Sequence, residues 1–434
     1  MTTVNEVAAA TVPDEVARAV VLPASYADLD GTVFPACEWL RHNAPVGLAE
    51  VEGYDPLWLI SKHADIKTVL RDAELFHSAD FNIMLQPQAG DEYLRNMLDG
   101  TTHVLNNLSY MEPPVHGRYR DATAHEFLPA QVRRFEPRFR EIAKAAVDHL
   151  MEREGECDFV SELSARYPLT AVLEMLGVPA EDYDYMLKVT QDTFGGDDSD
   201  WRRDDVPPTP EAMAKQWHHA VEEAYEYFEV IRKDRLANPR DDLATAIVTA
   251  KLEDGELMPE RIQNHLTLSV AVAGHDTTNS AISAGMHGLA LFPDQLDKVK
   301  ADPKLIPGLV DESLRWATPA KHFMRNATRD TELRGVEIKA NDRLMCMFVS
   351  GNRDEEAFPE PMNFDVTRRP NPHLSFSFGP HICLGQHIAK IEMRALFDEL
   401  IPRLGSVELA GEPTLKVSNF VSGFKRLPIR FTKA

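Results

Sequence analysis

One cysteine lies between two glycines in the segment 376–385 (FSFGPHICLG), directly before a run with helical character at 386–400. A sulfur just before a helix faces backbone N–H groups that lack partners and the positive end of the helix dipole. We therefore expect the pKa of Cys383 to be lowered and its thiolate to serve as a metal ligand. Gly379 and Gly385 allow the backbone to pass close to the sulfur. Because no second cysteine is near, the pattern favours the axial position of a haem iron over zinc or an iron–sulfur cluster. The alternative is a buried structural cysteine in a glycine-rich turn.

Composition narrows the class of protein. The formal net charge of −23 argues against a nucleic-acid partner. The four cysteines are scattered, at positions 37, 157, 346 and 383, which fits a reducing compartment. No secretory signal is visible at the N-terminus, and no run approaches the length of a membrane span. We therefore expect a soluble, cytoplasmic protein that does not bind membranes.

Periodicity and turn residues predict the order of elements. A long, largely apolar helix with polar residues only in its middle is expected at 261–291, buried on most sides. The other expected elements are two strands at 47–61, a helix at 132–150 that kinks or starts at Pro137, a helix at 304–316, irregular coil at 352–372, and strands at 331–350 and 407–431. No change of composition marks a boundary. We expect one domain over residues 1–434, loosely ordered at 1–14.

The segment 195–210 (GGDDSDWRRDDVPPTP) mixes glycines, acids and prolines. Taken alone, this composition is typical of a solvated loop without a role. A mobile lid that becomes ordered when a ligand binds is favoured instead by a family resemblance given below, which implies that the segment lies between two helices over the substrate pocket.

A polar motif interrupts the long apolar helix at 273–278 (AGHDTT). A glycine at this depth costs about 1 kcal/mol of helix propensity, and threonine hydroxyls can bond back to helix carbonyls. Asp276 and Thr277 together offer a carboxylate and an alcohol for moving protons in a dry pocket. The alternative is a helix N-cap region, which the apolar surroundings disfavour.

Two charged residues share a face of the expected helix at 304–316. Glu312 and Arg315 are three positions apart and can form an ion pair. The alternative interpretation is a solvent-exposed salt bridge that contributes little to stability.

These motifs together resemble those of the cytochrome P450 family. The segment 376–385 matches every fixed position of its haem signature, Phe-x-x-Gly-x-(His or Arg)-x-Cys-x-Gly, although Ser377 stands where the family usually has Gly. The segment 273–277 matches (Ala or Gly)-Gly-x-(Asp or Glu)-Thr, and 364–368 matches Phe-Asp-x-x-Arg. The resemblance spans residues 15–434. It implies a mainly α fold with small β-sheets, a triangular helical prism with haem between the long central helix and the cysteine loop.

The resemblance also implies roles for individual residues. Cys383 would be the metal ligand, with Phe376 and Gly385 beside the haem. Thr277 would hold a water and hydrogen-bond dioxygen, while Asp276 would relay protons. The haem propionates would be bound by His116, Arg120, Arg325 and His381. Arg368 would join Glu312 and Arg315 in a structural lock.

The expected substrate pocket is apolar. Ser269, Ala273 and Thr277 share one helix face. Alignment by motif adds Ala320, Phe420, Val421 and, as a roof, Phe81 and Leu85. Each of these could instead be an ordinary core residue. The set suits a small apolar substrate, a monoterpenoid such as a terpineol or an alkyl-aromatic hydrocarbon, into which one oxygen atom from O2 is inserted. Lys321 is expected to point away from this pocket.

Electrons must come from another protein, because the chain has no flavin or dinucleotide fingerprint. The resemblance implies the soluble bacterial branch of the family, served by a [2Fe-2S] ferredoxin and an NADH-dependent ferredoxin reductase. A basic docking patch is expected over the cysteine loop, formed by Arg118, Arg133, Arg134, Lys390 and Arg394.

Other functions remain open at this stage. A hydrogen-peroxide-driven peroxygenase of the same fold would replace the Asp276–Thr277 pair with residues that bind a substrate carboxylate. A non-catalytic haem sensor would have no use for a proton relay. A helical scaffold without haem would leave the matched signature without a purpose.

Overall fold

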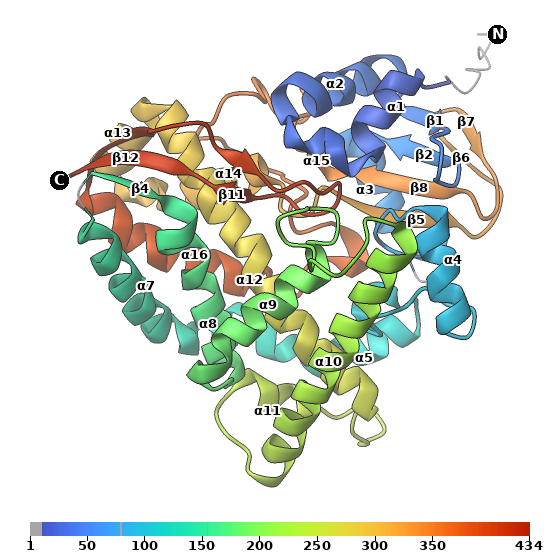
Figure 1. Cartoon of the computed structure of the whole chain (residues 1–434), viewed down its shortest axis with the longest axis horizontal. Helices are drawn as coiled ribbons and strands as arrows, with labels where there is room; N and C mark the ends of the chain where they lie inside the picture. Colours follow the sequence, from blue (N-terminus) through green and yellow to red (C-terminus); the bar gives the residue numbers. More distant parts are fainter. Residues whose placement is uncertain (1–10, 79, 154) are drawn as a thin grey trace.

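The computed structural model describes residues 11–78, 80–153 and 155–434 (Figure 1). It is mostly helical, with a roughly triangular outline, and α12 (Glu260–Leu291) runs through the middle. Nearly all of α12 is buried, as its apolar sequence predicts. None of the helices within these ranges has the length and apolarity needed to span a membrane.

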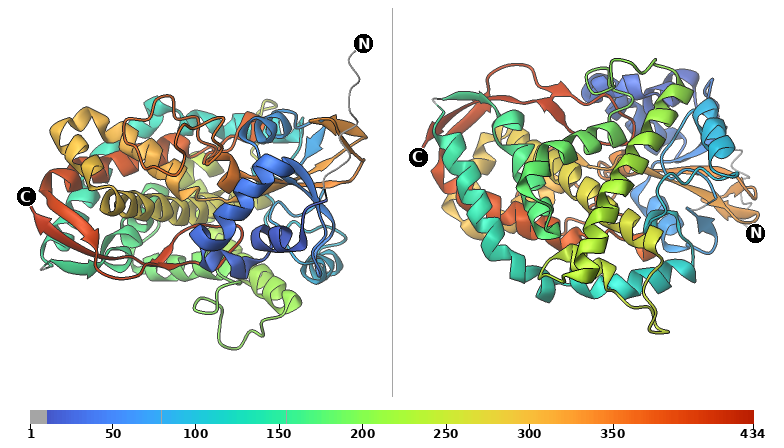
Figure 2. Two further views of the ribbon diagram at one scale, coloured as in Figure 1. Left: turned by 90° about the horizontal axis from the view of Figure 1, so that it is seen from above. Right: turned by 60° about the horizontal axis from the view of Figure 1, so that its bottom comes forward.

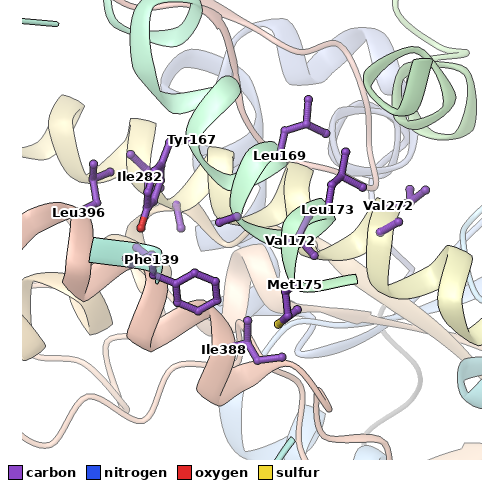
Figure 3. Close-up of a cluster of buried hydrophobic side chains, with 14 of the residues drawn as sticks. Phe139, Tyr167, Leu169, Val172, Leu173, Met175, Val272, Ile282, Ile388 and Leu396 are labelled. Atoms are coloured by element: carbon purple, nitrogen blue, oxygen red, sulfur yellow. The ribbon is translucent and has the colours of Figure 1, made fainter. Parts of the chain in front are cut away.

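Two helices, α8 (Arg166–Leu176) and α16 (Gln386–Leu400), pack against α12 in the main core. Helix α7 (Glu136–Met151) packs on both of them. Figure 3 shows Phe139 of α7, Val172 of α8 and Ile388 of α16 pointing toward one another beside α12. This core holds α16, and with it the preceding cysteine loop, against α12.

The helix expected at 132–150 starts near its proline. Residues 133–135 form a short 3-10 turn, and α7 begins at Glu136 with Pro137 in its first turn. A proline is tolerated there because its missing N–H would have no helical partner.

A five-stranded sheet occupies the end of the molecule opposite the C-terminal strands (Figure 2). Its strand order is β1 (Val46–Ala49), β2 (Leu57–Ile60), β8 (Arg343–Met347), β5 (His322–Ala327) and β3 (Phe76–His77). Strands β1 and β2 form the hairpin expected at 47–61, with Val46 opposite Ile60. Strand β5 carries residues from the sheet toward the interior next to α12.

The remaining elements complete the shell. The other helices are α1 (Asp14–Val21), α2 (Phe34–Asn43), α3 (His63–Arg71), α4 (Gln88–Met97), α5 (Val115–Ala124), α6 (Pro129–Val132), α9 (Tyr183–Phe194), α10 (Pro210–Ala237), α11 (Leu243–Val248), α13 (Pro293–Ala301), α14 (Ile306–Ala317) and α15 (Phe348–Gly351). The other strands are β4 (Glu156–Asp158), β6 (Thr331–Leu333), β7 (Val336–Ile338), β9 (Leu404–Leu409), β10 (Thr414–Leu415), β11 (Phe424–Arg426) and β12 (Pro428–Lys433). The segment expected as coil at 352–372 has no helix or strand.

The expectation of a loosely ordered segment at 1–14 lies partly outside the described residues, which begin at Thr11. Within them the expectation is wrong. Thr11 pairs with Leu48 of β1, Val12 is buried, and α1 begins at Asp14.

Candidate functional site

The cysteine loop is held by its own backbone. The N–H of Cys383 donates to the carbonyl of Phe376 at 2.8 Å. Gly379 has φ +74°, and a Cβ there would lie 2.3 Å from the carbonyl oxygen of Leu70. Gly385 has an ordinary φ of −81°, and a Cβ on it would lie 4.0 Å from the cysteine sulfur. Gly379 therefore shapes the turn, whereas a Cβ at Gly385 would make only an ordinary contact with the sulfur.

The sulfur of Cys383 faces an interior cavity, here called the cysteine cavity, and this is the space to which the residue is exposed. Burial raises the pKa of its thiol, while the N–H groups of Gly385 and Gln386 and the guanidinium of Arg120 act to lower it. The expected net lowering is thus wrong for the protein alone, because desolvation exceeds the effect of the helix N-terminus. A metal cation would supply the missing positive charge.

One face of α12 forms the opposite wall of the cysteine cavity. Ser269, Ala273 and Thr277 all line it, as expected from their helical spacing. The hydroxyl of Thr277 donates to the carbonyl of Ala273 at 2.6 Å, and that of Thr278 donates to Gly274 at 2.8 Å. The helix nonetheless stays α-helical throughout. The two hydroxyls therefore bond along the helix axis without breaking it.

Asp276 does not line the cysteine cavity. Its carboxylate is buried and forms an ion pair with the buried Lys416, which follows β10. The ring of Trp201, from the loop between α9 and α10, lies 4.5 Å from the Lys416 ammonium. Oxygen Oδ2 of Asp276 has no hydrogen-bond partner among the described residues. The carboxylate proposed as a relay is thus held on the side of α12 that faces the C-terminal strands.

Four expected propionate-binding residues converge near the sulfur. The rings of His116 on α5 and His381 lie 4.2 Å apart, and Arg120 donates to the carbonyl of Ile382 at 2.8 Å. Burial, with the positive charges of Arg120 and Arg325, lowers the pKa of His116 to about 4. Nε2 of both histidine rings is buried without a hydrogen-bond partner in the described structure, and that of His381 lies 4.0 Å from the Glu112 carboxylate.

These residues fit a haem. A cluster of buried donors and cations with orphaned ring nitrogens needs an anion, which the two propionates supply. The single sulfur across the cavity suits an axial ligand. Within the described ranges, no group of three or more His, Cys, Asp or Glu residues is arranged to hold a metal ion.

A buried ion-pair network lies under the cysteine loop. Arg315 donates to both carboxylate oxygens of Glu312, at 2.6 and 2.8 Å, and both side chains are fully buried. Nε of Arg368 lies 3.2 Å from the same carboxylate. Arg315 also donates to the carbonyls of Asn352, Pro361 and Asn363. The network fastens the coil that leads to Cys383. The alternative of a solvent-facing salt bridge between Glu312 and Arg315 is therefore wrong, because both side chains are buried.

The expected substrate residues divide into two groups. Ser269, Ala273 and Ala320 line the cysteine cavity. The residues Phe81, Leu85, Phe420 and Val421 are not among those that line it. The ring of Phe81 lies 5.0 Å from Arg95 and 5.3 Å from Arg343, so it binds cations on the sheet side instead of covering the cavity.

Phe420 and Val421 lie behind lining residues. The ring of Phe420 packs edge-on to Phe323 at 5.5 Å, and Val421 bridges to Ala320. Leu85 donates its N–H to the ring of the buried His322. Further residues line the cavity that were not expected from the sequence, namely Val172, Met175, Leu266, Val270 and Phe323. The apolar pattern of α8 was the available signal for the first two.

The segment expected to be a lid is fastened to the C-terminal strands, beside which it lies in Figure 1. The Asp198 side chain is buried. One of its carboxylate oxygens accepts a hydrogen bond from the N–H of Val417 at 2.9 Å, and the second accepts one from the ammonium of Lys425 at 3.0 Å. Asp200 accepts from Lys425 at 2.6 Å. In this structure the segment is therefore anchored over Lys416.

The expected basic patch is only partly free. Arg118 is paired with Asp254, Arg134 with Glu126, and Lys390 with Asp311. Arg133 and Arg394 are exposed, and neither has an ion pair with a described residue. Both line a surface hollow beside α16. The unneutralised charge of the patch therefore lies on these two arginines.

Comparisons with known proteins agree with the geometry. A family sequence model described as Cytochrome P450 matches residues 99–308 and 301–405. The Cytochrome P450-terp of a Pseudomonas species is 44% identical over 428 residues, covering 98% of this chain and 100% of that protein. The Steroid C26-monooxygenase of Mycolicibacterium smegmatis is 31% identical over 404 residues, covering 91% and 90%.

Solved structures are similar over almost the whole chain. CYP108D1 from Novosphingobium aromaticivorans has a TM-score of 0.89 and 38% identity, covering 98% of this chain and 100% of that one. Mycobacterium marinum cytochrome P450 CYP268A2, in complex with pseudoionone, has a TM-score of 0.85 and 29% identity, covering 98% and 99%.

Proposed function

Because this chain belongs to the cytochrome P450 family and is a monooxygenase of that family, we propose that it hydroxylates a compact monoterpenoid such as a terpineol. An alkyl-aromatic hydrocarbon is the second candidate substrate. The observation that carries the proposal is the apolar cavity between α12 and a lone cysteine, with Ala273 leaving space opposite the sulfur. One oxygen atom from O2 would enter a C–H bond there.

The similarity at the two ends of the chain supports the terpenoid substrate. The segments 52–56 (EGYDP) and 419–423 (NFVSG) are similar to those of the bacterial alpha-terpineol hydroxylase. The Pseudomonas relative carries the name P450-terp, and the structurally similar CYP268A2 was solved with pseudoionone. Val172, Met175 and Phe323 give the cavity apolar walls, and Arg120, which also lines it, is among the residues proposed to hold the propionates.

We propose haem b as the cofactor, with Cys383 as its ligand. When bound, the haem supplies the reductive activation of dioxygen, which a thiolate ligand favours. His116, Arg120, Arg325 and His381 would hold the propionates. The chain would form a single domain around this site.

Thr277 and Asp276 would manage protons. The Thr277 hydroxyl lies at the cavity wall and is oriented by its bond to the carbonyl of Ala273. It can hold a water beside the reacting carbon while the apolar walls exclude others. Asp276 would accept and release protons on the side of α12 that faces Lys416.

Electrons would arrive from a [2Fe-2S] ferredoxin and an NADH-dependent reductase, a partnership that belongs in the cytoplasm. Arg133 and Arg394 beside α16 give that partner a basic landing site. Replacing Arg394 by Gln should raise the KM for ferredoxin at low salt and leave turnover at saturating ferredoxin unchanged. Arg430→Gln, on β12, is the matched control. Equal effects of the two variants would argue against this docking face.

The haem assignment is tested by Cys383→Ser, with Cys157→Ser as the matched control. The absorption spectrum of the reduced carbon monoxide complex should change in the first variant alone. A Cys383→Ser protein with an unchanged spectrum that still hydroxylates its substrate would refute the assignment.

The substrate is tested by titrating the ferric protein with terpineol, ethylbenzene and a fatty acid. Terpineol should produce the low-to-high-spin change, because the cavity is apolar and compact. A change with the fatty acid alone would refute the proposed substrate class. Product formed with peroxide but not with ferredoxin and NADH would indicate a peroxygenase.

A further inference from the structure

A second cavity of about 480 Å³ adjoins the same stripe of α12, further toward its C-terminus. Ser280, Ala284 and His287 line it, and they continue the helical spacing that starts at Ala273 and Thr277. Its other walls come from the segment before α2, from the end of α14 and from the C-terminal strands. The volume lies in the range of small-molecule sites.

Two buried cations border the second cavity without a carboxylate at ion-pair distance in the described structure. Lys321 is 2% exposed, and its ammonium donates to the carbonyls of Ser418 and Val421. Arg353 is 4% exposed, and it donates to the carbonyl of Trp316 at 3.0 Å. Lys321 points away from the cysteine cavity, as expected, but its ammonium stays in the interior, where neighbouring carbonyls and the ring of Tyr26 accommodate it.

Orphaned polar atoms accompany these cations. Nε of Arg353 and Oγ of Ser280 are buried and have no hydrogen-bond partner among the described residues. Burial also lowers the pKa of Lys321 to about 7 and that of Arg353 to about 9, so desolvation outweighs the opposing effect of nearby acidic groups such as Asp276 and Asp30. A third cation at the cavity, Lys416, is already paired with Asp276. Lys321 and Arg353 are thus the cations at this cavity without a direct carboxylate partner among the described residues.

The side chains at the walls and the rim of the second cavity indicate the polarity and the charge of the ligand that would fit it. Tyr26, Phe34, Trp316 and Phe424 give aromatic walls, so most of the occupant is apolar. The exposed Asp28, Asp30 and Glu412 also border the cavity and would repel a highly charged anion.

We propose that the second cavity binds a small monoanion with an apolar ring, such as a monocyclic carboxylate, whose charged group meets Lys321, Arg353 and Ser280. This site is separate from the cysteine cavity and does not depend on the proposed substrate. Charge-assisted hydrogen bonds from two buried cations make the anion, and not its neutral analogue, the preferred occupant.

Benzoate and benzyl alcohol are the probes, used with the haem-loaded protein in titration calorimetry. Benzoate should bind at least about tenfold more tightly, the effect of one hydrogen bond to a charged group. It should leave the haem absorption spectrum unchanged. Equal binding of the two probes, or no benzoate binding at millimolar concentration, would overturn the proposal.

Matched variants on one stripe of α12 locate the site. Ala284→Leu fills the second cavity and should weaken benzoate binding by at least about tenfold, the cost of excluding a ring from its pocket. Ala273→Leu fills the cysteine cavity and should leave benzoate binding unchanged. The reverse result would place benzoate in the cysteine cavity and overturn the proposal.

A structural readout is independent of how well the variants fold. Crystals of the wild-type protein soaked with 4-bromobenzoate should show anomalous bromine signal between Ala284 and Phe34, with the carboxylate toward Lys321. Bromine found only beside Cys383, or only on the protein surface, would overturn the proposal.

Discussion

Replacing Glu312 by glutamine removes a charge from the centre of the network under the cysteine loop. The carboxylate accepts from both Nε and Nη2 of Arg315, from the N–H of Asp365 at 2.9 Å, from Arg368 and from Asn371 at 3.0 Å. A glutamine amide turns one of these two acceptor oxygens into a donor, so at least two donors lose their partner.

The cost follows from burial. Glu312 and Arg315 are both 0% exposed, so the variant leaves a guanidinium in the interior without its counter-charge. Breaking such a pair costs about 3–5 kcal/mol, a large part of the about 5–15 kcal/mol that stabilises a typical domain. Because Arg315 also holds the coil before the cysteine loop, the variant should release haem more readily.

The measurement is urea unfolding of the haem-loaded variant, followed by far-UV circular dichroism and by haem absorbance. Glu408→Gln is the control, because Glu408 and Arg430 form an exposed ion pair whose loss should have no measurable effect. If Glu312→Gln stays within about 1 kcal/mol of the wild type, the buried network is not what holds the loop.

Three further perturbations test the backbone and one buried ring. Gly379→Ala places a Cβ 2.3 Å from a backbone carbonyl oxygen at φ +74°, so it should lower the free energy of unfolding by at least about 2 kcal/mol. Gly117→Ala, at a helical position with open space, should raise it by about 0.5–1 kcal/mol. Equal effects of the two variants in thermal unfolding would contradict the strain argument. Ser377→Gly should stabilise by about 1 kcal/mol, because Ser377 has φ 64° and its buried hydroxyl lacks a described partner; a destabilised variant in the same assay would show that the serine is not strained. Burial lowers the pKa of His322 to about 3, so the folded protein keeps this ring neutral while the unfolded chain takes up a proton below about pH 6.5. The neutral His322 ring contributes fully to the free energy of unfolding above that pH, and this contribution falls toward pH 3. The difference in unfolding free energy between the wild type and His322→Gln should therefore shrink by about 1.4 kcal/mol per pH unit on acidification. A constant difference in urea unfolding from pH 6.5 to 4.5 would refute this pH dependence.

Features set by neighbouring residues could be predicted from the sequence. The long apolar run became α12, and the glycines around Cys383 gave a turn before α16. Ser269, Ala273 and Thr277 reached one cavity because helical spacing alone decides which residues share a face. The usual glycine at position 377 now has a physical reason in the positive φ of Ser377.

Features that depend on contacts with distant segments of the chain could not be predicted from the sequence. Phe81 carries no local signal that Arg95 and Arg343 would lie beside its ring. The pKa of Cys383 depends on how completely the fold removes water from the sulfur, and sequence reasoning saw only the helix N-terminus that opposes this effect. The sequence indicated only that Lys321 avoids the pocket, because the carbonyl partners that hold its ammonium in the interior lie about a hundred positions further along the chain.

Asp276 shows how a correct motif can still leave a direction open. Successive residues of an α-helix point about 100° apart, so Asp276 faces away from the cavity that Thr277 lines. The partner it meets, Lys416, is 140 positions away and becomes its neighbour only when the C-terminal strands cross α12. A proton that passes from Asp276 to the cavity must therefore travel around the helix, through water or through the Thr277 hydroxyl. In the proposed relay the carboxylate would serve the outer half of that path and the hydroxyl the inner half, from two neighbouring residues whose side chains point about 100° apart.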